Sequence, residues 1–308
     1  MTEKIGKVTL EYRFYSGNDS YTDGEVEDRL LEIVKNNPGG MYSNEIASEL
    51  SWPVLYHLSD IRENIINWYD FKENASVLEI GSGCGAISGI LSKKAKRVTA
   101  IELSKKRSYI NAYKNYNCEN LEILVGNFND IADSIDEKFD YVTLIGVLEY
   151  APLYISGQDP FNTFLNKIGN LLKPEGKIII AIENQLGLKY FAGCKEDHVG
   201  KLFEGIEGYT NTKEVKTFSR KSLKRLISNN GYDEIEFYYP YPDYKLPDKI
   251  YSENHLPQKG DLVEGFRNFD SDRVVLFDES KAFDSIIEAG LFEDMANSFL
   301  VIASKKEA

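Results

Sequence analysis

The sequence of 308 residues predicts an α/β protein with a doubly wound, mostly parallel sheet of seven strands. Three observations predict this fold. Apolar runs of strand length alternate with segments of helical periodicity, a glycine-rich turn follows the first apolar run of the alternating region, and an acidic residue ends the next run. Strands that alternate with helices pair in parallel, and their crossover helices cover the sheet.

The glycine-rich turn covers residues 81–85, directly after the apolar run Val77–Ile80. Glycine at every second position lets the backbone approach a ligand closely. Glu102 ends the next predicted strand, about twenty residues after the glycines, where an acidic residue can accept hydrogen bonds from both ribose hydroxyls. A solvated acid at the strand end is the alternative for Glu102. Together the turn and Glu102 indicate a cofactor that contains adenosine.

The glycine spacing alone also fits a dinucleotide site, and a tight turn without a ligand is a further alternative. Glu79, two residues before Gly81, favours a different cofactor. A carboxylate there would repel a pyrophosphate but could hold a zwitterionic or cationic ligand. S-adenosylmethionine is such a ligand.

At these residues the chain resembles the class I S-adenosylmethionine-dependent methyltransferases, whose first motif has the form acidic-hydrophobic-Gly-x-Gly-x-Gly. The resemblance continues in the run 139–150, similar to the family's fourth strand and its Leu-Glu-His ending, and in Leu172–Lys177, similar to its Leu-Lys-Pro-Gly-Gly turn. It implies a Rossmann-like methyltransferase fold, S-adenosylmethionine as the cofactor and S-adenosylhomocysteine as the product.

The resemblance also implies a set of cofactor-binding residues. Asn127 stands where the family usually has an acidic residue contacting the adenine amino group, and an Asn can accept that hydrogen bond or cap a loop instead. Cys84 is expected to pack rather than react. The predicted cofactor-binding residues are Glu79, Gly81, Ser82, Gly83, Cys84, Gly85, Glu102, Leu103, Asn127, Phe128, Gly146 and Leu148.

The composition limits the kinds of partner that we expect for this chain. The net charge is -13, which argues against a broad phosphate-neutralising surface and a nucleic-acid partner. The three cysteines show no paired spacing, so we expect neither disulfides nor a metal site. No apolar segment approaches the roughly 20 residues that cross a bilayer. We therefore expect a cytoplasmic protein that does not insert into membranes, and the oligomeric state stays open.

The expected organisation has two parts. Residues 1–70 form an N-terminal helical cap, and residues 71–308 form the methyltransferase domain. Two inserts, at about 184–218 and 240–296, follow strands five and six. The expected strands are 76–81, 97–102, 121–126, 140–146, 177–183, 234–239 and 298–302, the last antiparallel beside the sixth.

Three residues near the ends of strands four and five are the predicted catalytic residues: Glu149, Glu183 and His198. Methyl transfer is a displacement that chiefly requires an aligned, deprotonated nucleophile. A hydroxyl acceptor benefits from a general base, and the pKa of histidine suits that role. In Glu196-Asp197-His198 a neighbouring carboxylate could orient the ring. A loop histidine with a purely structural role is the alternative.

Segments 183–193, 196–198 and 239–247 also resemble a bacterial methyltransferase group associated with surface-glycan assembly. This resemblance implies a small-molecule or carbohydrate acceptor, methylated at oxygen or nitrogen. An RNA methyltransferase, a non-catalytic S-adenosylmethionine-binding adaptor and a dehydrogenase are the alternatives. No Asn-Pro-Pro-Tyr-like motif follows the fourth strand, which disfavours methylation of exocyclic amines in nucleic acids.

Overall fold

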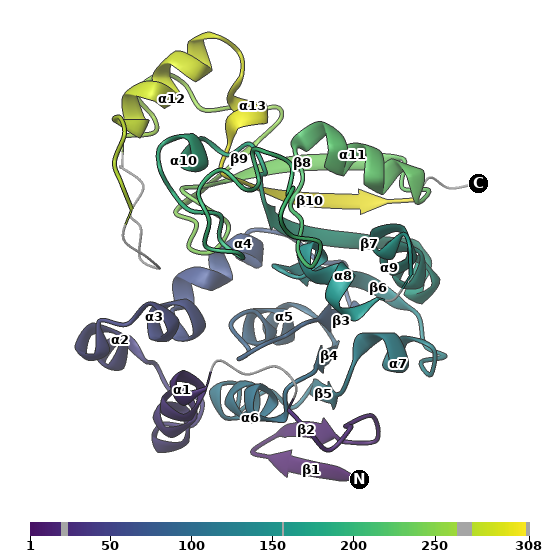
Figure 1. Ribbon diagram of the computed structural model, residues 1–308. Coiled ribbons are helices and arrows are strands. Elements are labelled where there is room, and N and C mark those ends of the chain that lie inside the picture. The colour runs from purple at the N-terminus through teal and green to yellow at the C-terminus, as the bar shows by residue number, and fades with distance from the viewer. Residues whose placement is uncertain (20–23, 156, 264–272, 306–308) are drawn as a thin grey trace. The chain divides into compact units, whose positions relative to one another are not determined.

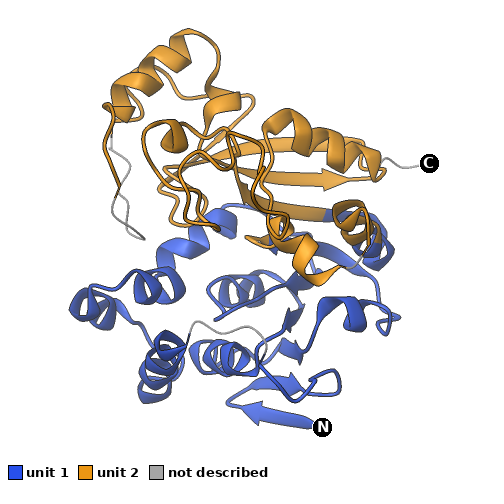
Figure 2. Cartoon of the chain, viewed as in Figure 1, with its two compact units in different colours: residues 1–144, 167–177 blue, residues 145–166, 178–308 orange. Residues whose placement is uncertain are grey.

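The computed structural model describes residues 1–19, 24–155, 157–263 and 273–305 (Figure 1). The chain divides into two compact units (Figure 2). Unit 1 comprises residues 1–144 and 167–177, and unit 2 comprises residues 145–166 and 178–308. Each unit is described by itself below.

Unit 1 is built on strands in the order β1-β2-β5-β4-β3-β6. Except for the antiparallel pair of β1 and β2, neighbouring strands are parallel. All five residues of β3 are buried, as in a parallel sheet covered on both faces. The bounds are β1 Thr2–Ile5, β2 Val8–Glu11, β3 Ser76–Ile80, β4 Arg97–Glu102, β5 Leu121–Val125 and β6 Phe139–Ile145.

The helices of unit 1 bury apolar faces. Helix α6 packs along β4 and β5, and α1 packs on α6. Residues Leu30, Ile33 and Val34 of α1 share a buried cluster with Ile110 of α6. The bounds are α1 Glu25–Asn36, α2 Ser43–Glu49, α3 Trp52–Leu58, η1 Asp60–Glu63, α4 Asn64–Asn67, α5 Ser88–Lys94, α6 Lys105–Lys114 and α7 Phe128–Ala132.

Unit 2 contains most of β7, the first part of α9, and strands in the order β7-β10-β8-β9. Strand β8 is antiparallel to both β10 and β9. Helix α11 packs on β8, with Leu223 and Ile227 buried. The bounds are β7 Leu172–Glu183, β8 Glu234–Tyr241, β9 Lys249–Ser252, β10 Ser298–Ser304, η2 Leu148–Tyr150, α8 Ala151–Tyr154, α9 Pro160–Leu171, α10 Leu188–Phe191, α11 Arg220–Asn229, α12 Glu279–Glu288 and α13 Phe292–Met295.

Each of the seven expected strands occurs, as β3, β4, β5, β6, β7, β8 and β10. The last is antiparallel to the sixth, as predicted. The predicted number of strands is wrong, because the described residues form ten. The additional strands are β1 and β2, which extend unit 1 beside β5, and β9, which lies in the insert at 240–296.

Two expectations concern the N-terminal segment and the second insert. Residues 2–11 form a hairpin where helices were expected, and α1 to α4 follow between residues 25 and 67. The insert at 240–296 contains β9, α12 and α13, while its residues 264–272 lie outside the described part. A search of the described helices finds none with the length and apolar character needed to span a membrane.

Candidate functional site

The glycine turn of unit 1 has a left-handed backbone at three alternate positions. Gly81, Gly83 and Gly85 have φ values of 67°, 53° and 79°, a region that favours glycine. The turn is attached to the neighbouring strand, since the N–H groups of Gly81 and Ser82 donate to the Ile101 carbonyl at 2.9 and 3.1 Å.

Two of these glycines have different surroundings. A Cβ on Gly85 would lie 2.3 Å from Asn111 Oδ1 and 2.6 Å from Asn115 Nδ2. A Cβ on Gly83 would meet no atom within 4 Å. Gly85 is therefore required for packing against α6, whereas Gly83 leaves open space that a ligand can approach.

Glu102 connects the glycine turn to the end of β4. Its carboxylate accepts a hydrogen bond from Gly83 N at 2.8 Å and another from Ser104 N at 2.9 Å. Burial raises the pKa of Glu102, an effect that the Ser104 and Gly83 hydrogen bonds and the charge of Arg107 oppose. Each carboxylate oxygen keeps accepting capacity beyond the hydrogen bond it already has.

Glu79 is buried in β3 and accepts a 2.6 Å hydrogen bond from Ser88 Oγ. Burial raises its pKa to about 8, and the nearby charge of Glu102 adds to the effect. Glu79 is thus largely protonated at neutral pH. The argument that its negative charge would repel a pyrophosphate loses force, and the identity of the cofactor depends on other observations.

The remaining predicted cofactor residues lie in the glycine turn, after β4, after β5 and, for Gly146 and Leu148, after β6 in unit 2, and their contacts with a ligand stay predictions. Cys84 packs in the buried cluster with α1, as expected of a packing residue. Asn127 caps α7 by accepting from Asn129 N at 2.9 Å, the capping role left open above. Ser82 Oγ accepts from Asn111. Leu103 is half-buried, Phe128 and Leu148 are buried, and Gly146 has a φ of 70°.

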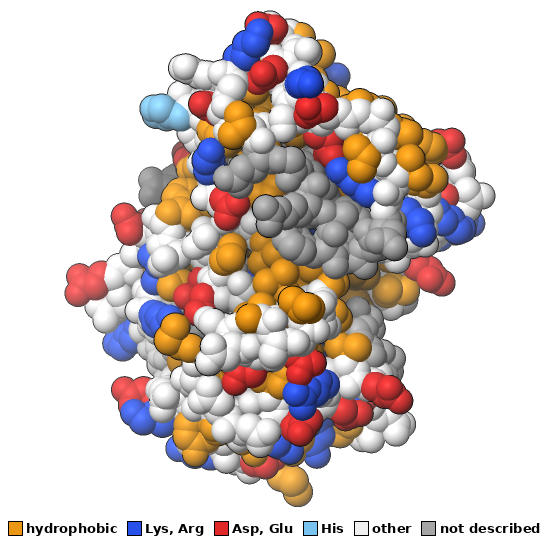
Figure 3. Space-filling view, turned by 90° about the vertical axis from the view of Figure 1, so that its left-hand side faces the viewer, with side chains coloured by type: hydrophobic (Ala, Val, Ile, Leu, Met, Phe, Trp, Pro, Cys, Tyr) orange, Lys and Arg blue, Asp and Glu red, His pale blue; other side chains and the backbone are white. Residues whose placement is uncertain are grey.

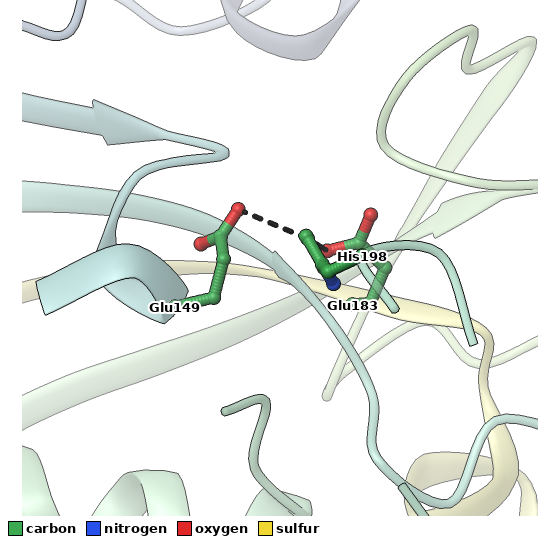
Figure 4. A group of neighbouring side chains, drawn as sticks. All are labelled: Glu149, Glu183 and His198. Carbon is green, nitrogen blue, oxygen red and sulfur yellow. Dashed lines mark ion pairs between the residues drawn. The ribbon is translucent and has the colours of Figure 1, made fainter. Parts of the chain in front are cut away.

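In unit 2 the structure brings together the three predicted catalytic side chains (Figure 4). Glu149 lies in η2, Glu183 ends β7 and His198 follows α10. His198 Nε2 lies 3.5 Å from Glu149 Oε1 and 3.7 Å from Glu183 Oε2. All three side chains are at most 5% exposed. Their catalytic role stays a prediction.

Glu196 holds the His198 ring from the other side. Its Oε1 lies 2.9 Å from His198 Nδ1, while its Oε2 accepts from the backbone N–H groups of His198 and Val199 at 2.7 and 2.8 Å. Tyr209 OH donates to the same carboxylate at 3.0 Å. The ring of Tyr150 packs edge-on to the imidazole. The orientation of His198 is therefore fixed, with Nε2 directed toward Glu149 and Glu183.

Two lysines border this group, Lys189 fully buried and Lys245 partly buried. Lys245 Nζ pairs with Glu183 and lies 2.8 Å from Asp197 Oδ1. Lys189 Nζ lies 2.7 Å from Asp243 Oδ2 and 3.0 Å from Asp197 Oδ2. We call the whole set the acidic cluster; its members are Glu149, Glu183, Lys189, Glu196, Asp197, His198, Asp243 and Lys245.

The charged and buried surroundings shift the pKa values of His198 and Glu149. Burial opposes a charged imidazole, but Glu183, Glu149 and Glu196 outweigh it and raise the pKa of His198 well above its usual value. Burial raises the pKa of Glu149, and the charge of Glu183 adds to the effect. Glu149 Oε2 and Glu183 Oε2 are buried without a hydrogen-bond partner among the described residues. Such oxygens are costly unless a ligand proton or a cation satisfies them.

Four residues of this region were not among the predicted site residues: Lys189, Asp243, Lys245 and Tyr209. Asp243 and Lys245 lie in the segment 239–247, which carried the resemblance to glycan-associated methyltransferases. A lysine flanked by prolines and aromatic residues has no distinctive spacing relative to Glu183, 62 positions earlier. Only the path of the chain brings these residues together.

Residues 78–180 match the family model described as "Methyltransferase domain". This segment is a methyltransferase domain. The domain contains the glycine turn, Glu102, Asn127 and Glu149, and its family uses S-adenosylmethionine as the cofactor.

Curated relatives of the methyltransferase domain share parts of the chain. The "Ribosomal RNA small subunit methyltransferase A" of Borreliella afzelii is 38% identical over 85 residues, which are 27% of this chain and 30% of that protein. The protein of the same description from Mycoplasma mobile is 29% identical over 161 residues, or 51% and 56%. The chain thus spans between about a third and a little over half the length of these relatives.

A solved structure described as a SAM-dependent methyltransferase from Archaeoglobus fulgidus has a TM-score of 0.50 and 14% identity. The match covers 82% of this chain and 97% of the Archaeoglobus fulgidus chain. This similarity shows the Rossmann-like methyltransferase fold.

Proposed function

We propose that the protein transfers the methyl group of S-adenosylmethionine to a small-molecule or carbohydrate acceptor, at oxygen or nitrogen. The observation that carries the proposal is the acidic cluster, in which three predicted catalytic side chains converge although they lie up to 49 positions apart. A buried, oriented group of titratable residues with unsatisfied carboxylate oxygens is typical of a site that binds and deprotonates a polar ligand.

The cofactor is assigned to the glycine turn and Glu102. Gly83 leaves space for the ligand, and the Glu102 carboxylate is held by Gly83 N and Ser104 N in a fixed position. Two further hydrogen bonds, from the ribose hydroxyls, complete its accepting capacity. Glu79, Asn127 and the other predicted residues complete the proposed cofactor site.

The acidic cluster is assigned to the acceptor. In the reaction the bond between the acceptor atom and the methyl carbon forms as the bond from carbon to sulfur breaks, which leaves neutral S-adenosylhomocysteine. An acceptor hydroxyl loses its proton in this step. Glu149 and Glu183 supply the carboxylates that receive the proton, and His198, whose pKa they raise, orients them and the hydroxyl.

Calorimetry with S-adenosylhomocysteine tests the cofactor assignment. Glu102→Gln should weaken binding about 10- to 100-fold, because charge-assisted hydrogen bonds contribute about 1.5–3 kcal/mol. Glu122→Gln is the control, since Glu122 lies on the neighbouring strand β5 and is half-buried. Absence of heat with the wild-type protein at millimolar ligand would overturn the proposal.

Formation of S-adenosylhomocysteine with pools of sugars, nucleotide-linked sugars and small hydroxyl or amine compounds tests the acceptor class. His198→Asn and Glu149→Gln should each lower turnover at least about 100-fold while S-adenosylhomocysteine still binds. Binding of cofactor without turnover on any pool would favour the non-catalytic adaptor.

RNA is the second candidate acceptor, because the curated relatives act on ribosomal RNA according to their names. The net charge of -13 favours a small acceptor. Lys and Arg side chains are also interspersed with Asp and Glu over the face shown in Figure 3. Methylation of ribosomal RNA, with affinity that falls steeply as salt rises, would establish the RNA candidate instead.

A further inference from the structure

We propose that Glu149, Glu183 and His198 bind a divalent first-row transition-metal ion. No metal site was expected from the sequence, because the three cysteines show no paired spacing. The three ligand atoms come instead from η2, the end of β7 and the loop after α10, and all lie within 4.8 Å of one another (Figure 4).

The distances fit a shared ion better than direct hydrogen bonds. Ligand atoms about 2.1 Å from one ion are roughly 3.0 to 3.4 Å apart in octahedral or tetrahedral geometry. His198 Nε2 lies 3.5 Å from Glu149 Oε1 and 3.7 Å from Glu183 Oε2, and the three ligand atoms all lie within 4.8 Å of one another. The two carboxylates must therefore move inward by roughly half an ångström or more to form the site. A hydrogen bond at 3.6 Å or more is negligible.

The unsatisfied oxygens are the independent observation that points to a ligand. Glu149 Oε2 and Glu183 Oε2 are buried without a hydrogen-bond partner in the described residues, and the two side chains are at most 1% exposed. The two buried carboxylates have ligand oxygens within 4.8 Å of each other, and at such a separation they repel each other when both are ionised. A cation between them removes the repulsion and supplies the missing interaction.

The charge of the acidic cluster agrees with a dication. The cluster has five carboxylates, Glu149, Glu183, Glu196, Asp197 and Asp243, and two ammonium groups. With His198 protonated the excess is two negative charges, and a divalent ion that displaces the imidazole proton leaves an excess of one. An isolated buried excess of this size is unfavourable.

The contacts of His198 are those of a metal ligand. Metal-binding histidines commonly direct the second ring nitrogen to a carboxylate, which fixes the ring and its tautomer. Glu196 Oε1 occupies this place at 2.9 Å from Nδ1, and Glu196 is itself held by two backbone N–H groups and Tyr209. Imidazole favours a transition ion over Mg²⁺ or Ca²⁺.

Three protein ligands leave coordination positions open. An acceptor hydroxyl bound there would have a lowered pKa, as metal-bound water does, and would lose its proton more readily. This second part rests on the proposed function; metal binding itself does not.

Cobalt titration of the full chain, stripped with a chelator, tests the proposal. We expect one equivalent of Co²⁺ per chain with visible d–d bands, and competition by Mn²⁺ and Zn²⁺. Glu149→Gln, Glu183→Gln and His198→Gln should each weaken binding at least about 100-fold. Glu279→Gln is the matched control, because Glu279 is also buried with an unpartnered oxygen, beside Arg273 rather than a histidine.

Several results would overturn the proposal: no binding of Co²⁺, Mn²⁺ or Zn²⁺ by the wild-type protein at millimolar metal, unchanged binding in the three variants, thiolate charge-transfer bands from coordination by cysteine, or a preference for Mg²⁺. Circular dichroism identifies a variant that fails to fold, and the wild-type titration then decides. Calorimetry with S-adenosylhomocysteine on the stripped protein separates failure of the metal proposal from failure of the proposed function. Cofactor binding should survive metal removal, so this measurement tests the proposed function alone.

Discussion

At the scale of single residues, Gly83 and Gly85 share a backbone conformation but differ in what surrounds them. Gly85→Ala places a methyl group against Asn111 and Asn115 and also strains a φ of 79°. We expect a loss of about 2–4 kcal/mol in unfolding free energy, measured by urea denaturation.

Gly83→Ala is the comparison for this prediction. Gly83→Ala should lower the unfolding free energy by only about 1 kcal/mol, the cost of a left-handed backbone for a residue with a side chain, because its Cβ meets no atom within 4 Å. Its affinity for S-adenosylhomocysteine should nevertheless fall, since the methyl group enters the open space. Equal stability losses in the two variants would contradict the distinction between a packing glycine and a ligand-facing one.

Glu79 makes stability depend on pH. Its folded pKa of about 8 exceeds the unfolded value of about 4.3, so the folded state keeps a proton that the unfolded chain has released. The unfolding free energy should therefore fall as pH rises from about 4.3 to 8 and level off above that. Glu79→Gln should lose less stability between pH 6 and 9 than the wild type, and parallel curves from chemical denaturation would refute the prediction.

At the scale of elements, Asp140 connects β6 to the start of β3. Its carboxylate accepts hydrogen bonds from Ser76 N and Ser76 Oγ at 2.8 Å, and it pairs with Lys72 and Lys173. Burial would raise the pKa of Asp140, but Lys173, Lys72 and Ser76 together hold it well below its usual value. These contacts fix the beginnings of two adjacent strands.

Asp140→Asn should lower the unfolding free energy at pH 7 by about 1.5–3 kcal/mol, the range for hydrogen bonds to charged groups. The stabilisation is complete above the unfolded pKa of about 3.9 and is lost as pH falls through the lower folded pKa. The difference between wild type and variant should therefore shrink below pH 4 in acid denaturation. A constant difference would mean that ionisation of Asp140 is irrelevant.

The elements also show what the sequence could predict. Strands such as β3, β4 and β5 are short, mostly apolar runs separated by helical segments, so their positions were predictable from local pattern. The hairpin of β1 and β2 was missed because each strand has four residues. The alternation of Val8 and Leu10 with polar residues, next to Gly6-Lys7, is the signal that could have found it.

The acidic cluster was predictable only in part. Glu149, Glu183 and His198 were candidates because they follow strands four and five, and one of the neighbouring carboxylates, Glu196 or Asp197, was expected to orient the ring. The participation of Lys245 and Asp243 was not predictable, since it depends on how the chain returns after β8. Long-range pairing of this kind leaves no periodic pattern in the sequence.

At the scale of the whole molecule, cofactor binding should stabilise the folded state by mass action. S-adenosylhomocysteine at 100 times its dissociation constant contributes about 2.7 kcal/mol. We expect a concentration-dependent rise in the melting temperature of the wild type, measured by calorimetry. Glu102→Gln should show a much smaller rise at the same ligand concentration, and an equal rise would place the ligand elsewhere.

The ion pairs of Lys189 and Lys245 in unit 2 have a consequence for chemical labelling. Although burial opposes their charge, Asp197 and Asp243 raise the pKa values of Lys189 and Lys245. An ammonium group without a free electron pair does not react with acylating reagents. In the native protein these two lysines should stay unmodified, while exposed Lys259 and Lys281 are acylated. Mass spectrometry of acylated peptides would thus report the integrity of unit 2, and rapid native acylation of Lys189 would contradict its ion pairing.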